Sequence, residues 1–344
     1  MAEEPRARVS VVMLTHNELV HLDESLSSLH DQSRPADEVI VVDNASTDGS
    51  VEFVQRRFPD VRLLANRDNV GFARGNNLGA RCATGDYVVF INNDVRLDRL
   101  WLEELVRPLE TNPDLVACQS LVLLYNEPER INTSGTTVNF LGVGWCRDYR
   151  RPRDSTLSLE VPTVSGAAFA IRRDVFVANG GFDESYFIYH EDIDLSWRLR
   201  LQGHQLALAP RSIVYHKYRF TRHARKYYLL ERNRIMTLIK NYRLPTLLLI
   251  TPAFLLTEVG ICVLALRQGW LRPKLAGYRD LIRSLPALAG KRREVQRRRR
   301  LPDRLMKTWM VGTIDFEEIN HPLVRLGGRI LTGYWTAVRP LIVW

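Results

Sequence analysis

The chain has 344 residues, of which 45% are hydrophobic and 25% are charged. This composition excludes a disordered or low-complexity chain and favours about two domains with substantial cores. The four cysteines are widely spaced and form no CxxC pair, so we expect no zinc knuckle or disulfide framework, and a reducing compartment fits. The N-terminus contains acids and no apolar core, so we do not expect a secretory signal.

Charge is distributed unevenly along the chain, although its net value is only +9. Residues 1–210 hold 21 Lys and Arg against 31 Asp and Glu, whereas residues 211–310 hold 24 against 5. This asymmetry predicts two different tasks. The basic part is suited to nucleic acid, anionic lipid or a phosphorylated substrate.

The first hundred residues alternate apolar runs with helical patterns. Strands are predicted at 9–14, 38–42, 61–64 and 87–91, and helices at 18–29, 46–58 and 70–83. This alternation predicts an α/β fold, with a mostly parallel sheet covered by helices on both faces. Polar clusters at 15–18, 43–46 and 92–94 follow three of the strands. Ligands bind beyond the carboxyl ends of strands in such sheets, so these clusters predict a binding site.

The rest of the chain is less regular. Short β-like runs and Gly-rich turns fill residues 117–165; a strand is predicted at 167–171, a helix at 191–202, and short strands at 206–209 and 213–215. Residues 244–266 are apolar except for Glu258, and they are long enough to span a bilayer core of about 30 Å. A basic run at 291–300 and an apolar, aromatic tail follow.

Three patterns near the predicted strand ends are candidates for ligand binding. Asp43 could accept hydrogen bonds from a base or a ribose, or it could cap the next helix. Asp94, beside Asn92 and Asn93, could form half of a divalent cation site, or it could belong to a turn. The Gly-rich segment 69–80 is not a Walker loop, but its Asn and Arg donors at a helix start suit phosphate or sugar oxygens.

The sharpest pattern is the acidic cluster at 191–194, beside aromatic residues. Such a cluster suits a general base in a partly apolar pocket. The alternative is an acidic helix N-terminus with an ordinary pair between Asp194 and Arg198, and we expect Asp194 to play that structural role. His216 becomes a metal ligand only if the fold brings it near Asp94. The basic helix at 225–241 could bind phosphate or simply face solvent.

Several motifs in this order resemble those of family 2 glycosyltransferases, in their bacterial rhamnosyltransferase-like branch. The strings are SVVMLTHNE, VVDNASTDGSVE, NVGFARGNNLGA, YVVFINNDV, VSGAAFAIRRDVF, GGFDESYFIYHEDIDLSWRLRLQGH and the VYH that ends at His216. The resemblance, over about 8–243, implies the GT-A fold, a Rossmann-like nucleotide-diphospho-sugar transferase domain. It would occupy residues 1–216, with a nucleotide-binding half at about 1–100 and an acceptor half at about 101–216. A basic helix at 217–243 and a helical, membrane-associated region at 244–344 would follow.

The resemblance also implies a role for each matched residue. Asp192 would be the catalytic base, supported by Glu191. Asp94 and His216 would hold Mg²⁺ or Mn²⁺, although an amide, Asn92, replaces the first acid of the family's DxD motif. Gly166, Trp197 and Arg232 would lie on the acceptor side. The nucleotide sugar would be bound by Thr15, Asn17, Glu18, Asp43, Ser46, Asp48, Asn69, Gly71, Asn76, Asn77, Asn92 and Asn93.

The implied reaction is the inverting transfer of a sugar, with rhamnose as the expectation, from a dTDP- or UDP-sugar. The acceptor would be a hydroxyl of a polyprenyl-linked glycan or a polysaccharide in cell-envelope synthesis. Because Asn92 carries no charge, the alternative is a catalytically silent sugar- or lipid-binding partner of a polysaccharide synthase. We expect no nucleic-acid partner, since no aromatic platform or recognised module accompanies the run at 291–300.

The apolar segment 244–266 lies between basic segments at 217–243 and 291–300. A single membrane pass would export one of them, against the preference of basic residues for the cytoplasmic side. A re-entrant or interfacial arrangement keeps both inside, and Pro245 and Pro252 favour a broken helix. A spanning helix and a buried soluble helix remain alternatives. We expect the chain to contact membrane lipid on the cytoplasmic face of the bacterial inner membrane.

Overall fold

The computed structural model describes residues 6–218, 224–314 and 322–344, and the chain forms two compact units. Unit 1 comprises Met1–Thr136, Cys146–Leu195 and His204–Tyr218, and unit 2 comprises Thr137–Trp145, Ser196–Gly203 and Arg219–Trp344. Residues 219–223 of the predicted basic helix and 315–321 of the tail lie outside the described residues.

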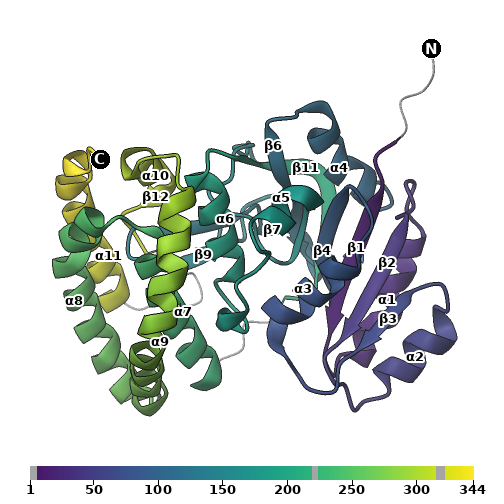
Figure 1. Ribbon diagram of the computed structural model, residues 1–344, viewed down its shortest axis with the longest axis horizontal. Helices are drawn as coiled ribbons and strands as arrows, with labels where there is room; N and C mark the ends of the chain where they lie inside the picture. Colours follow the sequence, from purple (N-terminus) through teal and green to yellow (C-terminus); the bar gives the residue numbers. More distant parts are fainter. Residues whose placement is uncertain (1–5, 219–223, 315–321) are drawn as a thin grey trace. The chain divides into compact units, whose positions relative to one another are not determined.

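Unit 1 is built on a mixed sheet (Figure 1). Its strands are β1 (Val9–Thr15), β2 (Glu38–Asp43), β3 (Arg62–Ala65), β4 (Tyr87–Asn92), β5 (Val95–Leu97), β6 (Leu115–Leu124), β7 (Glu127–Thr133), β10 (Ala168–Arg172) and β11 (Gln205–His216). Their order is β3-β2-β1-β4-β10-β6-β11-β5, with β7 beside β6. The first four strands are parallel, as the alternating pattern predicted, and β10 pairs antiparallel with β4 and β6.

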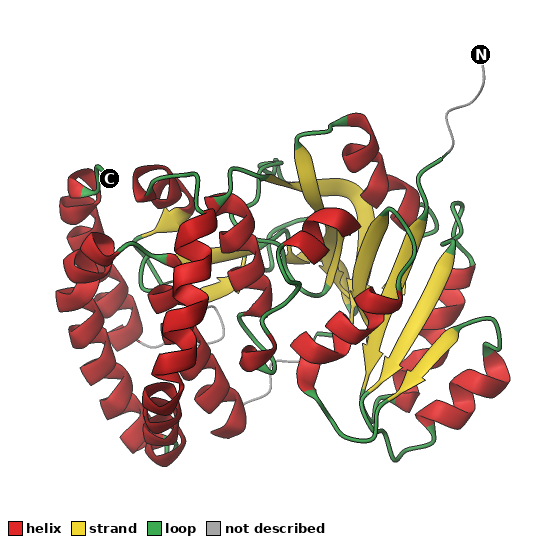
Figure 2. Cartoon of the chain, viewed as in Figure 1, coloured by secondary structure: helices red, strands yellow, loops and turns green. Residues whose placement is uncertain are grey.

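Helices cover both faces of this sheet (Figure 2). They are α1 (Leu19–His30), α2 (Ser50–Arg57), α3 (Gly71–Cys82), α4 (Trp101–Thr111), α5 (Arg173–Ala178), the short 3₁₀ helix η1 (Glu184–Tyr186) and the first part of α6 (Glu191–Leu201). The core between the layers is buried and apolar, with Val11, Leu26 and Trp101 among its members. The predicted strands and helices of unit 1 are therefore confirmed, with two differences. Helix α2 begins four residues late, at Ser50, and the two short strands expected at 206–209 and 213–215 form one strand, β11, with a register shift between Ala209 and Ile213.

The glycines of α3 let this helix approach β1 closely. A Cβ atom at Gly79 would lie 2.4 Å from Val12 Cγ1, and one at Gly75 would lie 2.4 Å from Leu14 Cδ1. Such distances are shorter than any tolerated contact, so larger side chains would push the helix off the sheet. These two glycines are therefore explained by packing.

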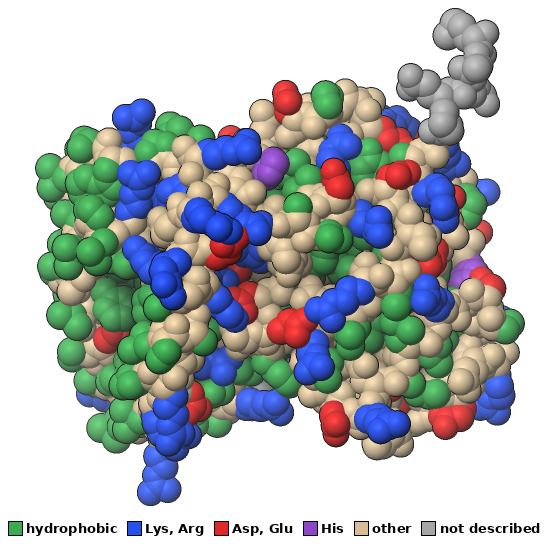
Figure 3. All heavy atoms as spheres, viewed as in Figure 1, with side chains coloured by type: hydrophobic (Ala, Val, Ile, Leu, Met, Phe, Trp, Pro, Cys, Tyr) green, Lys and Arg blue, Asp and Glu red, His purple; other side chains and the backbone are tan. Residues whose placement is uncertain are grey.

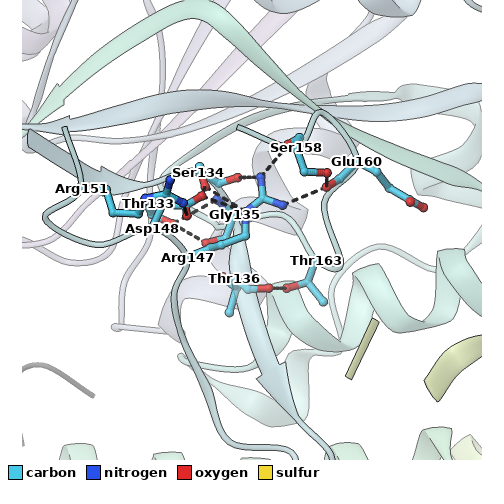
Figure 4. A network of polar contacts seen from close by, with 10 residues as sticks. All are labelled: Thr133, Ser134, Gly135, Thr136, Arg147, Asp148, Arg151, Ser158, Glu160 and Thr163. Carbon is cyan, nitrogen blue, oxygen red and sulfur yellow. Dashed lines mark hydrogen bonds and ion pairs between the residues drawn. The ribbon is translucent and has the colours of Figure 1, made fainter. Parts of the chain in front are cut away.

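The irregular region around 134–163 is held by a polar network instead of a β-ladder (Figure 4). Arg147 Nε donates to Ser134 Oγ at 2.9 Å, and its Nη atoms donate to the carbonyl oxygens of Ser134, Ser158 and Glu160 at 2.8–3.0 Å. Asp148 accepts from the Ser134 hydroxyl at 2.5 Å. One half-buried guanidinium thus satisfies several loop carbonyls that have no strand partner.

Unit 2 is mainly helical. It contains α7 (Ala224–Asn241), α8 (Leu244–Arg267), α9 (Leu271–Arg298), α10 (Asp303–Met306) and α11 (Pro322–Val338), with a small sheet of order β12-β8-β9. The strands of that sheet are β8 (Thr136–Asn139), β9 (Gly144–Cys146) and β12 (Met310–Val311). Helix α7 packs along α9, and α8 contacts both α9 and α11.

Helix α8 is continuous, so the expected break at the prolines is wrong. Pro245 occupies the first turn, where a missing N–H costs nothing and the fixed φ suits a helix. Pro252 removes one internal hydrogen bond, on an exposed part of the helix. Within the described part of the chain, α8 is the one helix whose length and composition would allow it to cross a membrane.

Candidate functional site

A buried carboxylate lies where β1 and β2 end side by side. Thr15 is the register partner of Asp43, and both side chains are buried. Asp43 Oδ2 accepts a hydrogen bond from the Ser46 N–H at 2.9 Å, whereas its Oδ1 has no partner in the part of the chain that the structure describes. A buried carboxylate oxygen without a donor is costly, so this atom is suited to a donor supplied by a ligand.

The loops after β1 and β2 are tied together by short polar contacts. The Asn17 N–H donates to Ser46 Oγ at 2.9 Å, and Asn17 Oδ1 accepts from the Thr47 N–H at 2.8 Å. Asp48 Oδ2 accepts from the Leu19 N–H at 2.9 Å. Helix α2 begins after Gly49, so Ser46 belongs to the loop and does not cap the helix. These side chains form the frame around Asp43.

Two acids in these loops, Asp48 and Glu18, interact with residues close to them in the chain. Burial favours the neutral form of Asp48, but the hydrogen bonds from the Ser50 hydroxyl and from the Leu19 and Ser50 N–H groups outweigh it and lower the pKa of Asp48. Glu18 lies 3.4 Å from His21 on the next helical turn. Asp48 is thus a negative charge held in place in the loops around Asp43.

The start of α3 is joined to the loop before α6. Asn69 Oδ1 accepts from the Gly71 N–H at 3.0 Å, and Asn44 Nδ2 donates to the Gly71 carbonyl at 3.1 Å. Gly71 has φ of +83°, and a Cβ there would lie 2.5 Å from the Phe187 ring. Only glycine fits this position, since both the backbone conformation and the close approach exclude a side chain.

Asn76 and Asn77 are turned into the protein. Asn76 donates to the Phe72 carbonyl at 3.0 Å, and Asn77 exchanges two hydrogen bonds with the backbone of Phe182, at 2.8 and 2.9 Å. Both side chains are buried. The Asn77 amide holds α3 to the loop before η1, whereas Asn76 bonds within α3 itself. The predicted contact of both residues with the donor stays a prediction.

A carboxylate and an imidazole meet where β5 pairs with β11. His216 is the register partner of Val95, and this pairing places its Nε2 atom 3.1 Å from Asp94 Oδ1. The same nitrogen lies 3.5 Å from Asn92 Nδ2. Burial opposes ionisation of Asp94, yet contact with His216 lowers the pKa of this carboxyl below its usual range. The fold therefore brings His216 to Asp94, which is the condition under which the sequence predicted His216 as a metal ligand.

Asn132, on β7, orients the His216 ring. Its Oδ1 atom lies 2.8 Å from His216 Nδ1 and can only accept, so Nδ1 carries a hydrogen and Nε2 is held toward Asp94. A carboxylate and an imidazole lone pair fit Mg²⁺ or Mn²⁺, which takes its other ligands from water and phosphate oxygens. No cluster of three His, Cys, Asp or Glu ligands occurs among the described residues. Nothing in the sequence pattern pointed to Asn132.

Two adjacent acids begin α6: Glu191 is buried, and Asp192 is partly exposed. Asp192 Oδ2 accepts from the Gly166 N–H at 2.9 Å, and Oδ1 accepts from the Ile193 N–H at 2.7 Å. Burial raises the pKa of Asp192 in spite of these hydrogen bonds. Burial and then the charge of Asp192 raise the pKa of Glu191 well above its usual range, and Glu191 Oε2 has no hydrogen-bond partner within the described segments.

The loop directly before this pair is strained. Phe187, Tyr189 and His190 all have φ between 65° and 72°, a region that side-chain-bearing residues rarely adopt. The Ile188 N–H donates to the Tyr186 carbonyl at 2.8 Å, which closes a γ-turn around Phe187. Each such residue costs about 1–3 kcal/mol, a cost that is typical of functional sites. No pattern in the sequence indicated this backbone strain.

A continuous row of contacts joins these groups along the carboxyl ends of the strands. Asn93 Nδ2 donates to Thr15 Oγ1 at 2.9 Å, and the Asn92 N–H donates to the Ala167 carbonyl at 3.0 Å. The row runs, in order, through Asp43, Thr15, Asn93, Asn92, Ala167, Gly166 and Asp192. The row therefore connects Asp43 with Asp192 along one edge of the sheet, and Asp94 directly follows Asn93 in the chain.

Two predicted acceptor-side residues belong to unit 2. Trp197 is fully buried, with its ring edge-on to Tyr242 at 6.4 Å between centroids. The Arg232 guanidinium lies over the Tyr228 ring at 5.3 Å. Their acceptor-side role stays a prediction, whereas Gly166, the third such residue, donates directly to Asp192.

Comparison with known proteins identifies the family. A profile described as Glycosyl transferase family 2 matches residues 10–179. N-acetylglucosaminyl-diphospho-decaprenol L-rhamnosyltransferase of Mycobacterium tuberculosis is 30% identical over 229 residues, which cover 60% of this chain and 75% of that protein. Human polypeptide N-acetylgalactosaminyltransferase 3 is 29% identical over 239 residues, or 62% of this chain. The chain spans only 37% of that relative's length.

Solved structures show the same fold. GalNAc-T7 with UDP, GalNAc and Mn²⁺ has a TM-score of 0.57 at 19% identity, covering 69% of this chain and 48% of that one. The mannosyltransferase PcManGT of Pyrobaculum calidifontis, in complex with GDP-Man and Mn²⁺, has a TM-score of 0.51 at 20% identity, covering 99% and 88%. Unit 1 has the GT-A fold of these glycosyltransferases. The chain belongs to glycosyl transferase family 2.

Proposed function

We propose that this chain is an inverting glycosyltransferase that moves a sugar, rhamnose by our expectation, to a hydroxyl of a lipid-linked acceptor in cell-envelope glycan synthesis. The observation that carries the proposal is the row of contacts from Asp43 past Asn92 to Asp192. The name of the mycobacterial relative, which combines rhamnose with a decaprenol-linked acceptor, supports both the sugar and the acceptor class.

The donor, a dTDP- or UDP-sugar, would bind at the ends of β1 and β2. Asp43 Oδ1 is buried and has no donor in the described structure, so it is suited to a base N–H or a ribose hydroxyl. Thr15, Asn17, Ser46 and Asp48 hold the surrounding frame.

Asp94 and His216 would hold Mg²⁺ or Mn²⁺, with Asn92 beside them. When bound, such a cation neutralises the charge that develops on the leaving diphosphate. Because Asn92 brings no charge, the low pKa of Asp94 matters: this carboxyl stays ionised at every physiological pH. Asn132 keeps the Nε2 lone pair of His216 available for the cation. Two structural neighbours contain Mn²⁺.

Asp192 would act as the base. It takes the proton of the acceptor hydroxyl, whose oxygen attacks the anomeric carbon from the face opposite the diphosphate. The bond to the diphosphate breaks, the diphosphate leaves with the electron pair, and the configuration inverts. The N–H groups of Gly166 and Ile193 fix the carboxylate in place, and burial makes Asp192 a stronger base than an exposed aspartate. Burial and the charge of Asp192 raise the pKa of Glu191, which opposes the formation of a second negative charge beside Asp192.

The domain organisation is part of the proposal. A catalytic domain at 1–216 would be followed by the basic helix at 217–243 and a membrane-associated region at 244–344, placed on the cytoplasmic face of the membrane. The apolar helix α8 and the decaprenol-linked acceptor in the relative's name support this location.

A donor screen tests the proposed function. The purified chain is incubated with a panel of nucleotide sugars and a polyprenyl-diphosphate acceptor, and release of nucleoside diphosphate is followed with and without EDTA. We expect release with a dTDP- or UDP-sugar that stops when EDTA removes the metal. Binding of a nucleotide sugar without any turnover would support the second candidate, the silent partner of a synthase, which Asn92 in the DxD position favours.

A further inference from the structure

Helix α8 has two faces of opposite character. Along one side, large apolar side chains are 47–66% exposed: Leu244, Leu248, Leu255, Leu256, Val259, Val263 and Leu266. We call these seven residues the apolar platform. Arg243 and Arg267 flank it at the two ends of the helix. Figure 3 shows hydrophobic side chains gathered over the region of α8 and α11. Such a patch is unusual on a soluble surface and marks an interaction site.

The opposite side of α8 is fixed to its neighbours by charge. Glu258 forms ion pairs with Arg234 of α7 and with Lys274 of α9, the latter at 2.9 Å. Glu231 of α7 contacts both cations, at 3.1 and 2.5 Å, and Tyr278 donates to Glu258. All of these groups lie inside unit 2, so the single acid of the apolar segment does not face the platform.

This network makes a membrane crossing by α8 costly. If Glu258 lay at the centre of a bilayer, α9 would enter the hydrocarbon with it through Lys274. Arg279 and Arg283, whose side chains are 60% and 70% exposed, follow within nine residues of Lys274. Nine helical residues span about 14 Å, less than half of a bilayer core of about 30 Å. Exposed guanidinium groups would therefore meet acyl chains, which membranes strongly disfavour.

Lying flat avoids this cost. With α8 in the plane of the interface, the platform enters the acyl region while the ionic network stays on the protein side. The flanking Arg243 and Arg267 then reach the headgroups, where cations are favoured by anionic lipid. Exposed apolar residues on the helices that contact α8, Leu275 and Ile282 of α9 and Ile330 of α11, add to the apolar surface of unit 2.

We propose that α8 is an in-plane membrane anchor whose apolar platform inserts into the surface of a bilayer that contains anionic lipid. The inference rests on the proposed membrane location and extends it, because it names the inserting face and excludes a crossing. The inference does not depend on which sugar is transferred, so it can be tested by measuring membrane binding without measuring enzyme activity.

Vesicle flotation tests the platform. The purified full-length chain is mixed with vesicles of phosphatidylcholine that contain about one third phosphatidylglycerol. We expect Leu255→Asp/Val259→Asp to reduce the bound fraction about tenfold, since both side chains are exposed and their replacement leaves the core intact. The matched control is Leu159→Asp/Val177→Asp, which changes two equally exposed residues of unit 1 and is expected to float like the wild type.

Three results would overturn the platform. The first is equal flotation of the platform variant and the wild type, and the second is an equal loss of flotation in the control. The third is a wild-type chain that forms a dimer in detergent-free solution and does not bind vesicles, while the platform variant is monomeric. The last would assign the face to a second copy of the chain. Circular dichroism confirms that both variants fold.

Cysteine labelling tests the in-plane orientation. In a chain with Cys82, Cys118, Cys146 and Cys262 changed to Ser, a single cysteine is placed before α8 (Arg57→Cys) or after it (Arg293→Cys), both at exposed positions. Inverted inner-membrane vesicles are treated with a membrane-impermeant maleimide. An in-plane α8 exposes both positions to the reagent. Protection of Arg293→Cys alone, relieved by detergent, would show that α8 crosses the membrane and would overturn the inference.

Discussion

Both units of this protein bury acidic side chains, but they place them in opposite surroundings. In unit 2, Glu231 and Glu258 lie against Arg234 and Lys274, and although burial opposes ionisation, these cations lower the pKa of both acids. In unit 1, Glu191 is equally buried, but the charges that act on it are those of Asp192 and Asp194. Its pKa is raised well above the usual range.

The difference shows what each group is for. A buried carboxylate with cationic partners stays charged and stabilises the fold through ion pairs. Its removal leaves the charges of the buried cations uncompensated. A buried acid beside another acid keeps a high proton affinity, which is a cost to stability and an advantage to a base. Four predictions test this contrast, beginning with the largest effect.

Replacing Asp192 by Asn removes the group that we expect to accept the proton. The amide keeps the shape and one hydrogen bond, so the donor is still bound, but turnover falls about 10²–10⁴-fold. Product formation and donor affinity are measured separately. Because the pKa of Asp192 is raised, the wild-type rate should also fall with decreasing pH earlier than it would for an ordinary aspartate.

The matched control for this variant is Glu103→Gln, which changes an exposed acid of unit 1 that pairs with Arg107. It should leave turnover unchanged. If Asp192→Asn retained full turnover, Asp192 would not be the base, and the contrast between the units would lose its functional meaning.

Replacing Glu258 by Leu tests the other side of the comparison. Arg234 and Lys274 would then share Glu231 as their acid, deep inside unit 2. Breaking a buried ion pair in this way costs about 3–5 kcal/mol, measured as the free energy of unfolding in denaturant. The double variant Glu258→Leu/Lys274→Met removes one cation as well and should recover part of the loss. Equal stability of the single variant and the wild type would contradict a structural role.

Asp94 is an intermediate case, because its partner His216 is also a candidate metal ligand. Replacing Asn132 by Ala frees the imidazole to turn or to change tautomer, and we expect Mn²⁺ affinity to fall about 10–100-fold. Electron paramagnetic resonance of free Mn²⁺, titrated with protein and UDP, measures this directly. Asn126→Ala, an exposed position in the turn between β6 and β7, is the control. Unchanged affinity in the Asn132 variant would remove Asn132 from this role.

The sequence predicted the nucleotide-binding half well, for a physical reason. Its strands are short apolar runs between helical patterns, and the polar residues at the strand ends lie together because parallel strands end at one edge. Asp43 and Asp94 could therefore be chosen from the strand ends, whereas Asp192 was chosen from the acidic cluster at 191–194 and from the family resemblance. Contacts along this edge connect Asp43 with Asp192.

Other features were invisible or ambiguous because their signal depends on tertiary contacts. Asn132 lies on β7, and its approach to His216 depends on the pairing of β7 with β6 and of β6 with β11, which the sequence pattern around 117–165 did not show. The glycines of α3 look like a phosphate-binding pattern, yet Gly75 and Gly79 allow the helix to pack on β1. Pro252 reads as a helix breaker, but a long apolar helix tolerates it at an exposed position.

The smallest expected effect comes from Glu191→Gln, which removes the acid with the highest proton affinity. In the wild type, the pKa of Glu191 is raised on folding, so between its ordinary value and the raised value the native state binds more protons than the unfolded state. Stability therefore falls as pH rises through that window, and it is unaffected below it. Gln carries no titrating group, so the variant should match the wild type near pH 4 and melt about 2–4 °C higher at pH 9, which corresponds to roughly 1 kcal/mol. Melting temperatures across this pH range measure the slope, with Glu103→Gln as the control that leaves it unchanged. A variant that lost stability at high pH as steeply as the wild type would show that Glu191 is already ionised, and that unit 1 compensates its acids as unit 2 does.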